Sequence, residues 1–222
     1  VGTVMLDILS TRKNVYGEIR LIASKRSAGR QLKCRDELLT VVELTPEAFD
    51  GIDIAMFDVP DEISEKWAPI AAKRGAVVVD NSGAFRMDAD VPLVVPEVNP
   101  DAIKDFKNKN IIANPNCSTI QMVVALKPLH DLAKIKRIVV STYQAVSGAG
   151  KEAMDELFNS TKKIYENQHL EPKKFSKKIA FNVIPQIDIF MDDGITKEEW
   201  KMKKRQVERG REMRAAWSWY AG

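Results

Sequence analysis

The stretch "IDIAMFDVPDEISEKWAPIAAKRGAVVVD", Ile52 to Asp80, carries the strongest fold signal in the chain. Its first part, Ile52 to Asp58, reads as a β-strand. Residues Pro60 to Arg74 read as a helix, because a proline and an acidic residue open it and Gly75 ends it. Residues Ala76 to Asp80 form a continuous apolar run, which is typical of a strand buried on both faces of a parallel sheet. Strand, helix and strand in this order indicate a parallel α/β unit.

The segments on either side continue this alternation. Upstream, Val1 to Leu9 reads as a helix with one apolar face, and Glu18 to Ser24 and Leu38 to Leu44 read as strands. Downstream, Asn110 to Pro115 repeats the apolar pattern. We therefore expect a Rossmann-like, doubly wound parallel sheet over residues 1–115.

The pattern changes after residue 115. Helices are predicted over Ser118 to Leu132, over Lys151 to Asn167 and from Thr196 onward, with strand-like runs over 136–146 and 179–190. We interpret residues 116–202 as an incomplete α+β catalytic and dimerisation domain. Residues 203–222 form an atypical basic tail.

The composition excludes several classes of protein. The 222 residues are 45% hydrophobic and 29% charged, and no apolar run approaches the roughly 18–20 residues of a membrane span. The net charge of +3 arises in the basic tail, so it does not indicate a nucleic-acid partner. Two cysteines do not suggest a disulfide framework, and the first residues lack the features of a signal peptide. A cytoplasmic location is expected. Because the chain opens at Val1 and ends in an aromatic cluster unlike its body, we expect a fragment.

Cys117 is the most informative single residue. It opens the helix predicted over Ser118 to Leu132, and a helix N-terminus favours an anion, such as the reactive thiolate. The alternative is a buried cysteine that only fills space in a core. Position alone leaves both open.

Five sequence motifs, one of which contains Cys117, resemble those of one family. They are "ASKRSAG" (23–29), "DNSGAFRMDADVPLVVPEVNP" (80–100), "NPNCSTIQMVVALKPL" (114–129), "STYQAVSGAGKEAM" (141–154) and "TKEEWKM" (196–202). Together they resemble aspartate-semialdehyde dehydrogenase. The related N-acetyl-glutamyl-phosphate reductases share the architecture and are the alternative enzyme. They fit less well, because they lack the Asn-Cys-Ser-Thr run.

The resemblance implies reduction of β-aspartyl phosphate to aspartate semialdehyde with NADPH, on the route to lysine, threonine and methionine. In reverse, a cysteine thiolate attacks the aldehyde, hydride leaves to the nicotinamide, and phosphate attacks the resulting thioester. It also implies a homodimer and no metal.

The resemblance assigns roles to further residues. Cys117 is the nucleophile and Gln144 positions the acyl intermediate. Arg86 and Asn116 bind the substrate phosphate. Glu198 meets the substrate's amino group and Lys201 meets phosphate. Without the resemblance, Glu198 and Lys201 would read as an ordinary solvated ion pair one helical turn apart.

Cofactor residues are expected in several loops. Arg26 fits the 2′-phosphate of NADP, and the other candidates are Gly2, Ser24, Ser27, Gly148 and Gly150. The alternative for Ser24, Arg26 and Ser27 is a basic loop without a ligand. The alternative for Gly148 and Gly150 is an ordinary turn between a strand and a helix.

Two departures from the family pattern bear on activity. Where many members read Ser-Ala-Gly, this chain reads Asp58-Val59-Pro60, which puts cofactor affinity in doubt because Pro60 has no N–H. The family's acid–base histidine has no counterpart here, since the chain has only His130 and His169. A non-catalytic remnant is therefore a third interpretation.

Overall fold

The structure is a computed structural model that describes residues 2–12 and 16–203. It divides into two compact units, residues 1–132 and residues 133–222. The basic tail predicted for 203–222 lies outside the described residues, apart from the backbone of its first residue. The domain boundary near residue 115 stays a prediction.

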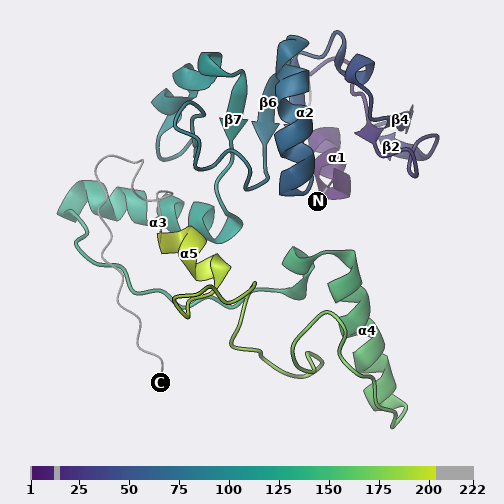
Figure 1. The fold of residues 1–222 in the computed structure, drawn as a ribbon, viewed down its shortest axis with the longest axis vertical. Helices are drawn as coiled ribbons and strands as arrows, with labels where there is room; N and C mark the ends of the chain where they lie inside the picture. The colour runs from purple at the N-terminus through teal and green to yellow at the C-terminus, as the bar shows by residue number, and fades with distance from the viewer. Residues whose placement is uncertain (1, 13–15, 204–222) are drawn as a thin grey trace. The chain divides into compact units, whose positions relative to one another are not determined.

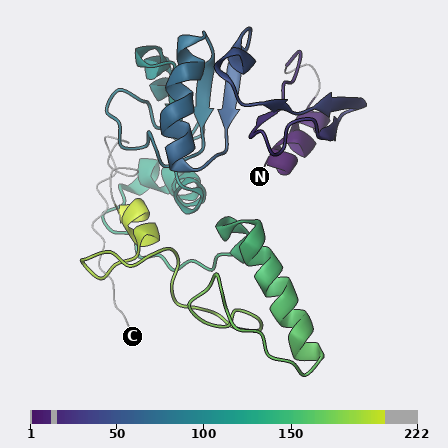
Figure 2. The same ribbon diagram turned by 45° about the vertical axis from the view of Figure 1, so that its right-hand side comes forward.

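A parallel three-stranded sheet organises the first unit. Its order is β5 (Ile54–Phe57), β6 (Val77–Asp80) and β7 (Ile111–Ala113). The strands are in register, since Phe57 pairs with Asp80 and Asp80 pairs with Ala113. Helix α2 (Asp61–Lys73) covers one face of this sheet (Figures 1 and 2). The predicted parallel α/β unit is therefore confirmed.

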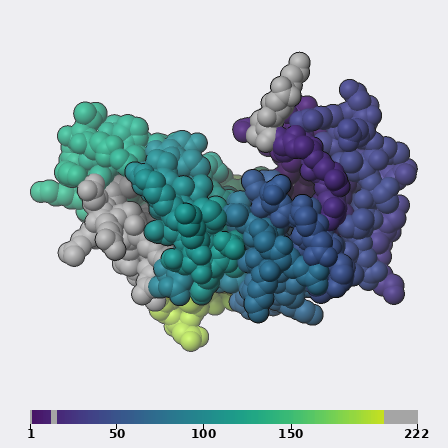
Figure 3. Space-filling model, turned by 90° about the horizontal axis from the view of Figure 1, so that it is seen from above, coloured from purple at the N-terminus to yellow at the C-terminus, as the bar shows by residue number. Residues whose placement is uncertain are grey.

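Small residues let α2 approach the sheet closely. Ala68 and Ala71 lie on one face of the helix and are fully buried, as is Val78 on β6. The Phe49 ring stacks on Phe57 at 5.9 Å between centroids and closes the end of this core. In the space-filling view the segments coloured blue to teal, which contain these residues, lie against one another (Figure 3).

The opposite face of the sheet is less buried than the sequence predicts. On β5, Ile54 and Met56 are 64% and 52% exposed, and on β6 Val77 and Val79 are half-buried. Side chains alternate between the two faces of a strand, and α2 lies on only one of them. The prediction that residues 76–80 are buried on both faces is therefore wrong for the described residues.

Two small sheets precede the central one. Strand β1 (Ile22–Ala23) pairs in parallel with β4 (Val42–Glu43), and β2 (Gln31–Cys34) forms a hairpin with β3 (Glu37–Thr40). The predicted strand 38–44 is thus divided. The N–H of Val41 still bonds to Arg30, whereas the N–H of Val42 bonds to Leu21, so the chain changes partner at that point.

The remaining elements of the first unit are helical. They are α1 (Gly2–Thr11), which contacts β2, the 3₁₀ helices η1 (Pro46–Phe49) and η2 (Pro100–Asn108), and α3 (Cys117–Ala133). The predicted helices over 1–9, 60–74 and 118–132 are confirmed within about two residues at most ends. Over the described ranges, no helix combines the length and the apolar character needed to cross a membrane.

The second unit is mainly helix and loop. It contains η3 (Val146–Ala149), α4 (Lys151–Tyr165) and α5 (Lys197–Lys203) (Figure 1). Helix α5 begins with a capping box: the Thr196 hydroxyl accepts the N–H of Glu199, whose carboxylate accepts the N–H of Thr196 at 2.6 Å.

The strands predicted over 136–146 and 179–190 are wrong for the described residues. These two segments contain isolated bridges but no strand, at Arg137 and between Phe190 and Thr196. An apolar run becomes a strand only when a neighbour completes its hydrogen bonds, and no described segment does so. Val139, Phe181 and Val183 are accordingly more than 60% exposed.

Candidate active site

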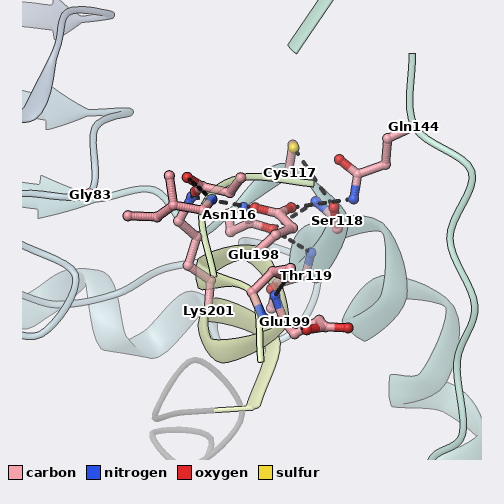
Figure 4. Close-up of polar contacts among 12 residues, drawn as sticks. Gly83, Asn116, Cys117, Ser118, Thr119, Gln144, Glu198, Glu199 and Lys201 are labelled. Carbon is pink, nitrogen blue, oxygen red and sulfur yellow. Dashed lines mark hydrogen bonds and ion pairs between the residues drawn. The ribbon is translucent and has the colours of Figure 1, made fainter. Parts of the chain in front are cut away.

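A short turn between β7 and α3 presents Cys117. Asn116 caps the helix: its Oδ1 accepts the N–H groups of Ser118 at 3.1 Å and Thr119 at 3.4 Å (Figure 4). Its carbonyl accepts the N–H of Ile120 at 3.0 Å, which closes the first helical turn. Cys117 is therefore the first residue of α3.

The two cysteines have opposite environments. Cys117 is exposed, and its Sγ lies 3.9 Å from the Ser118 hydroxyl. Cys34 is 3% exposed and packs against the Ser10 hydroxyl and the Leu6 carbonyl. The reading of Cys117 as a buried filler is therefore wrong, whereas it describes Cys34 well. An exposed thiol at the positive end of a helix can act as a nucleophile.

Arg86 lies in the same unit and joins two loops. Its Nε donates to the carbonyl of Asn114 at 2.8 Å, and its Nη2 donates to the carbonyl of Asn81 at 2.9 Å. Two of the five guanidinium N–H groups thus fix Arg86 beside the turn that leads to Cys117. Asn116, predicted to meet phosphate, is 6% exposed and has its oxygen engaged as the helix cap.

The second unit brings together three of the predicted residues. The amide of Gln144 donates to Oε1 of Glu198 at 3.3 Å, and the ammonium of Lys201 lies 3.4 Å from Oε2 of the same carboxylate (Figure 4). Glu198 is 6% exposed, and its two oxygens thus meet different partners. Glu198 and Lys201 thus contact each other across one helical turn, but the alternative of an ordinary solvated pair does not hold, because Glu198 is buried.

Sequence reasoning missed Asp188, the nearer partner of Lys201 at 2.8 Å. Burial opposes the charge of Asp188, but hydrogen bonds from Lys201 and from the N–H of Ile189 outweigh it, so the pKa of Asp188 is lowered. Burial likewise opposes the charge of Lys201, yet its bond to Asp188 raises the pKa of the lysine. The two residues are 13 positions apart, and no local period marks them as partners.

The turn after β1 has the chemistry of a phosphate-binding loop. The N–H of Ser27 bonds back to the carbonyl of Ser24 at 2.8 Å, so the two serines and Arg26 occupy one tight turn. Arg26 is exposed, and its side chain has no ion pair or hydrogen bond with the described residues. An exposed guanidinium in a turn that also contains two serines, at the carboxyl end of a strand, is able to bind a phosphate group.

The three predicted glycines open helices or precede them. Gly2 is the first residue of α1, and a Cβ there would meet no atom within 4 Å. Gly148 lies in η3 of the second unit. Gly150, with φ of +87°, precedes α4 in a conformation that residues with a Cβ rarely adopt.

The Asp58-Val59-Pro60 segment leads into α2. The carbonyl of Pro60 accepts the N–H groups of Ile63 and Ser64, both at 3.0 Å, so the proline opens the helix. Asp58 accepts a hydrogen bond from the side chain of Asn81 at 3.0 Å.

Comparison with known proteins identifies two family regions. Residues 1–106 match "Semialdehyde dehydrogenase, NAD binding domain", and residues 126–213 match "Semialdehyde dehydrogenase, dimerisation domain". The aspartate-semialdehyde dehydrogenase of Aquifex aeolicus is 56% identical over 204 residues, and aspartate-semialdehyde dehydrogenase 2 of Vibrio cholerae is 53% identical over 202. Both alignments cover 91% of this chain and 60% of the relative. The chain thus spans 60% of the length of these relatives.

Solved structures of aspartate-semialdehyde dehydrogenases are also similar to this chain. The crystal structure of aspartate semialdehyde dehydrogenase II from Vibrio cholerae, complexed with ASA, is 50% identical with a TM-score of 0.89, covering 95% of this chain and 62% of that one. A Candida albicans aspartate semialdehyde dehydrogenase with NADP, 24% identical, has a TM-score of 0.67 over 97% of this chain and 63% of that one, which supports the fold alone.

Proposed function

The chain belongs to the aspartate-semialdehyde dehydrogenase family, and from this membership we propose that it carries the nucleophile of an NADPH-dependent reduction of β-aspartyl phosphate to aspartate semialdehyde. The similarity to aspartate-semialdehyde dehydrogenases, one of them crystallised with ASA, supports this substrate. The observation that carries the proposal is the exposed thiol of Cys117 at the first residue of α3.

Cys117 performs the covalent step. Its thiolate attacks the acyl carbon of the substrate, the bond from that carbon to the phosphate oxygen breaks, and phosphate leaves with the bonding electron pair. The product on Sγ is a thioester. The helix N-terminus, capped by Asn116, favours the negative charge that Sγ carries before attack and regains when the aldehyde departs.

The other residues bind and orient the substrate. Arg86 receives the phosphate, because its guanidinium is held in place by two carbonyls and suits a tetrahedral anion. Asn116 caps the start of α3 and so holds the turn before Cys117 in place. Gln144 orients the acyl group. Glu198 receives the substrate's amino group and Lys201 its phosphate, and their mutual contact keeps both side chains extended from α5.

NADPH, when bound, supplies the hydride that brings the thioester to the aldehyde level. Arg26, Ser24 and Ser27 hold its 2′-phosphate, since an exposed guanidinium and two hydroxyls match that dianion. Gly2 begins the helix whose N-terminus faces the pyrophosphate in this fold class. Gly148 and Gly150 allow close approach of the backbone near the nicotinamide. Two copies of the chain associate through the second unit, as its family description indicates.

Protection of Cys117 from alkylation tests this proposal. In a Cys34→Ser chain, iodoacetamide labels one thiol, and aspartate semialdehyde is expected to slow that labelling by forming a thiohemiacetal. N-acetylglutamate semialdehyde is the matched control for the alternative enzyme. Labelling unaffected by either aldehyde would contradict Cys117 as the nucleophile, and stronger protection by the second aldehyde would reassign the substrate.

A further inference from the structure

The three parallel strands of the first unit end in register, and a polar residue follows each of them. Asp58 follows β5, Asn81 follows β6 and Asn114 follows β7. The sheet's hydrogen bonds continue into these residues: the N–H of Asn81 donates to Phe57 at 2.9 Å, and that of Asn114 donates to Asp80 at 2.8 Å. The backbone thus sets the three polar side chains next to one another.

Their side chains form a continuous line of hydrogen bonds. Nδ2 of Asn114 donates to Oδ1 of Asn81 at 2.7 Å, and Nδ2 of Asn81 donates to Oδ1 of Asp58 at 3.0 Å. The bonded residues are distant in sequence, since Asn81 and Asn114 are 33 positions apart and Asp58 and Asn81 are 23 positions apart. Asp58 is exposed at its outer end, while the two asparagines are half-buried.

A carboxylate fixes the direction of such a line. An amide can turn over and exchange its donor and acceptor, but an ionised carboxylate only accepts. Asp58 therefore requires the NH₂ group of Asn81 on its own side, which leaves the oxygen of Asn81 facing Asn114. The NH₂ group of Asn114 must then face Asn81. Without Asp58, nothing in this line selects that orientation of the two amides over the reverse.

We propose that Asp58 is a positioning residue for the turn that carries Cys117, acting through the side chains of Asn81 and Asn114. The inference rests on the proposed role of Cys117. Asn114 lies three residues before the thiol and is held at three points: its N–H by Asp80, its carbonyl by Arg86 and its amide by Asn81. Asp58 controls the third point. The same amide line bears on Arg86, which bonds to the carbonyls of both asparagines.

Other contacts hold the loop itself, so loss of Asp58 does not unfold it. The buried carboxylate of Asp80 accepts the hydroxyls of Ser64 and Ser82, each at 2.7 Å. Asp61 accepts the N–H of Gly83 at 2.7 Å. Removal of Asp58 is thus expected to reorient the amides while the fold remains.

Two variants test the hydrogen bond. Asp58→Ala removes the acceptor, and Asp58→Asn replaces the carboxylate, which only accepts, by an amide that can turn over. Glu62→Ala is the matched control, because Glu62 is a nearby exposed carboxylate whose side chain bonds to none of the described residues. All are made in the full 222-residue chain with Cys34→Ser, so that Cys117 is the only thiol.

Two measurements test the proposal. Asparagine-selective ¹⁵N spectra report the side-chain amides: Asp58→Ala is expected to shift the signals of Asn81 and of Asn114. Iodoacetamide kinetics as a function of pH report the thiol: Asp58→Ala is expected to slow alkylation by about two- to fivefold, the range that a helix end provides to an anion. Glu62→Ala should retain the parent rate, Asp58→Asn should lie between the parent and Asp58→Ala because its amide can turn over, and all variants should keep the parent melting temperature within a few degrees, as surface substitutions usually do.

Three results would overturn it. Unshifted Asn114 signals in Asp58→Ala would exclude the line of hydrogen bonds. Shifted signals with an unchanged alkylation rate would exclude an effect on Cys117. A Glu62→Ala rate as low as that of Asp58→Ala would show that nearby negative charge, rather than orientation, is responsible. The positioning role of Asp58 is tested by the ratio of the variant's alkylation rate to the parent's, which can be measured whatever the parent rate is. The proposed function is tested separately, because it fails if no aldehyde protects Cys117 of the parent chain from alkylation.

Discussion

Gly83 lies so close to the carboxylate of Asp61 that an added Cβ would require that carboxylate to move. Its N–H donates to Oδ1 of Asp61 at 2.7 Å, and a Cβ on residue 83 would lie 2.8 Å from Oδ2. The bond joins the start of α2 to the loop that contains Arg86. Proximity to the carboxylate, and not the backbone conformation, favours glycine here, because the φ of residue 83 lies outside the left-handed region.

Gly83→Ala should therefore destabilise the first unit. The added methyl group displaces the Asp61 carboxylate and weakens its bond to the N–H, at a cost of about 0.5–1.5 kcal/mol in the free energy of unfolding. Urea unfolding of the chain measures it. In an Asp61→Ala background the same change should cost much less, because the carboxylate that it would meet is gone. Equal costs in both backgrounds would show that the contact is unimportant.

Asn116→Ala should weaken the start of α3. The change removes the acceptor for two backbone N–H groups, which at a helix N-cap costs about 0.5–2 kcal/mol. Alkylation of Cys117 should slow as well, since the first turn that surrounds it frays. Asn116→Ser is the matched control, because serine caps helices about as well as asparagine. Thermal unfolding and iodoacetamide kinetics read out the two effects, and an unchanged melting temperature would contradict the assigned cap.

Arg26→Ala should reduce the preference for NADP over NAD. Hydrogen bonds to a charged group contribute about 1.5–3 kcal/mol, so the Kd for NADP should rise by about tenfold or more while that for NAD changes little. Calorimetric titration of the chain with each dinucleotide measures both values. Lys25→Ala, the adjacent exposed cation, controls for general charge. A parallel rise for both dinucleotides would remove the 2′-phosphate assignment.

Asp188→Asn should lower the stability of the second unit in a pH-dependent way. The pKa of Asp188 is lowered in the folded chain, so its contribution is present above its unfolded pKa of about 3.9 and disappears as the pH falls through the folded value. The pKa of Lys201 is raised, so its contribution lasts until the pH rises through the folded value, above about 10.4.

The expected loss at pH 7 is about 0.2–1 kcal/mol, as for a partly exposed ion pair, and it should shrink toward about pH 2, because protonation of Asp188 removes the charge that asparagine lacks. Urea unfolding followed by circular dichroism at both pH values measures it. Asp192→Asn is the control, since Asp192 is exposed and makes no ion pair with the described residues. A loss of equal size at both pH values would contradict an ionic origin.

The 222-residue chain should reduce NADP with aspartate semialdehyde and phosphate slowly. Of its two histidines, His130 is 3% exposed and lies 13 residues beyond Cys117 on α3, roughly 20 Å along the helix axis. His169 is exposed and pairs with Glu171 at 3.0 Å. General acid–base catalysis contributes about 10²–10⁴-fold. A rate within about tenfold of a full-length relative would mean that another group supplies it.

The sequence by itself determined the elements whose causes are local. The helix predicted over 60–74 is α2, because a proline, acidic residues and a final glycine act within one or two turns of it. The strand, turn and helix around Cys117 also follow from neighbouring residues. The resemblance named Gln144, Glu198 and Lys201 as site residues with separate roles, and in the second unit Glu198 contacts both of the others.

Only the tertiary structure decided which distant groups meet. Residues 38–44 divide between two partners at Val41, and residues 136–146 form no ladder, because pairing depends on a neighbour that no local pattern specifies. The bonds from Asp58 through Asn81 to Asn114 require three strands to end in register. Register is fixed by the packing of the whole sheet against α2, so these contacts, and that of Asp188 with Lys201, could be read only from the fold.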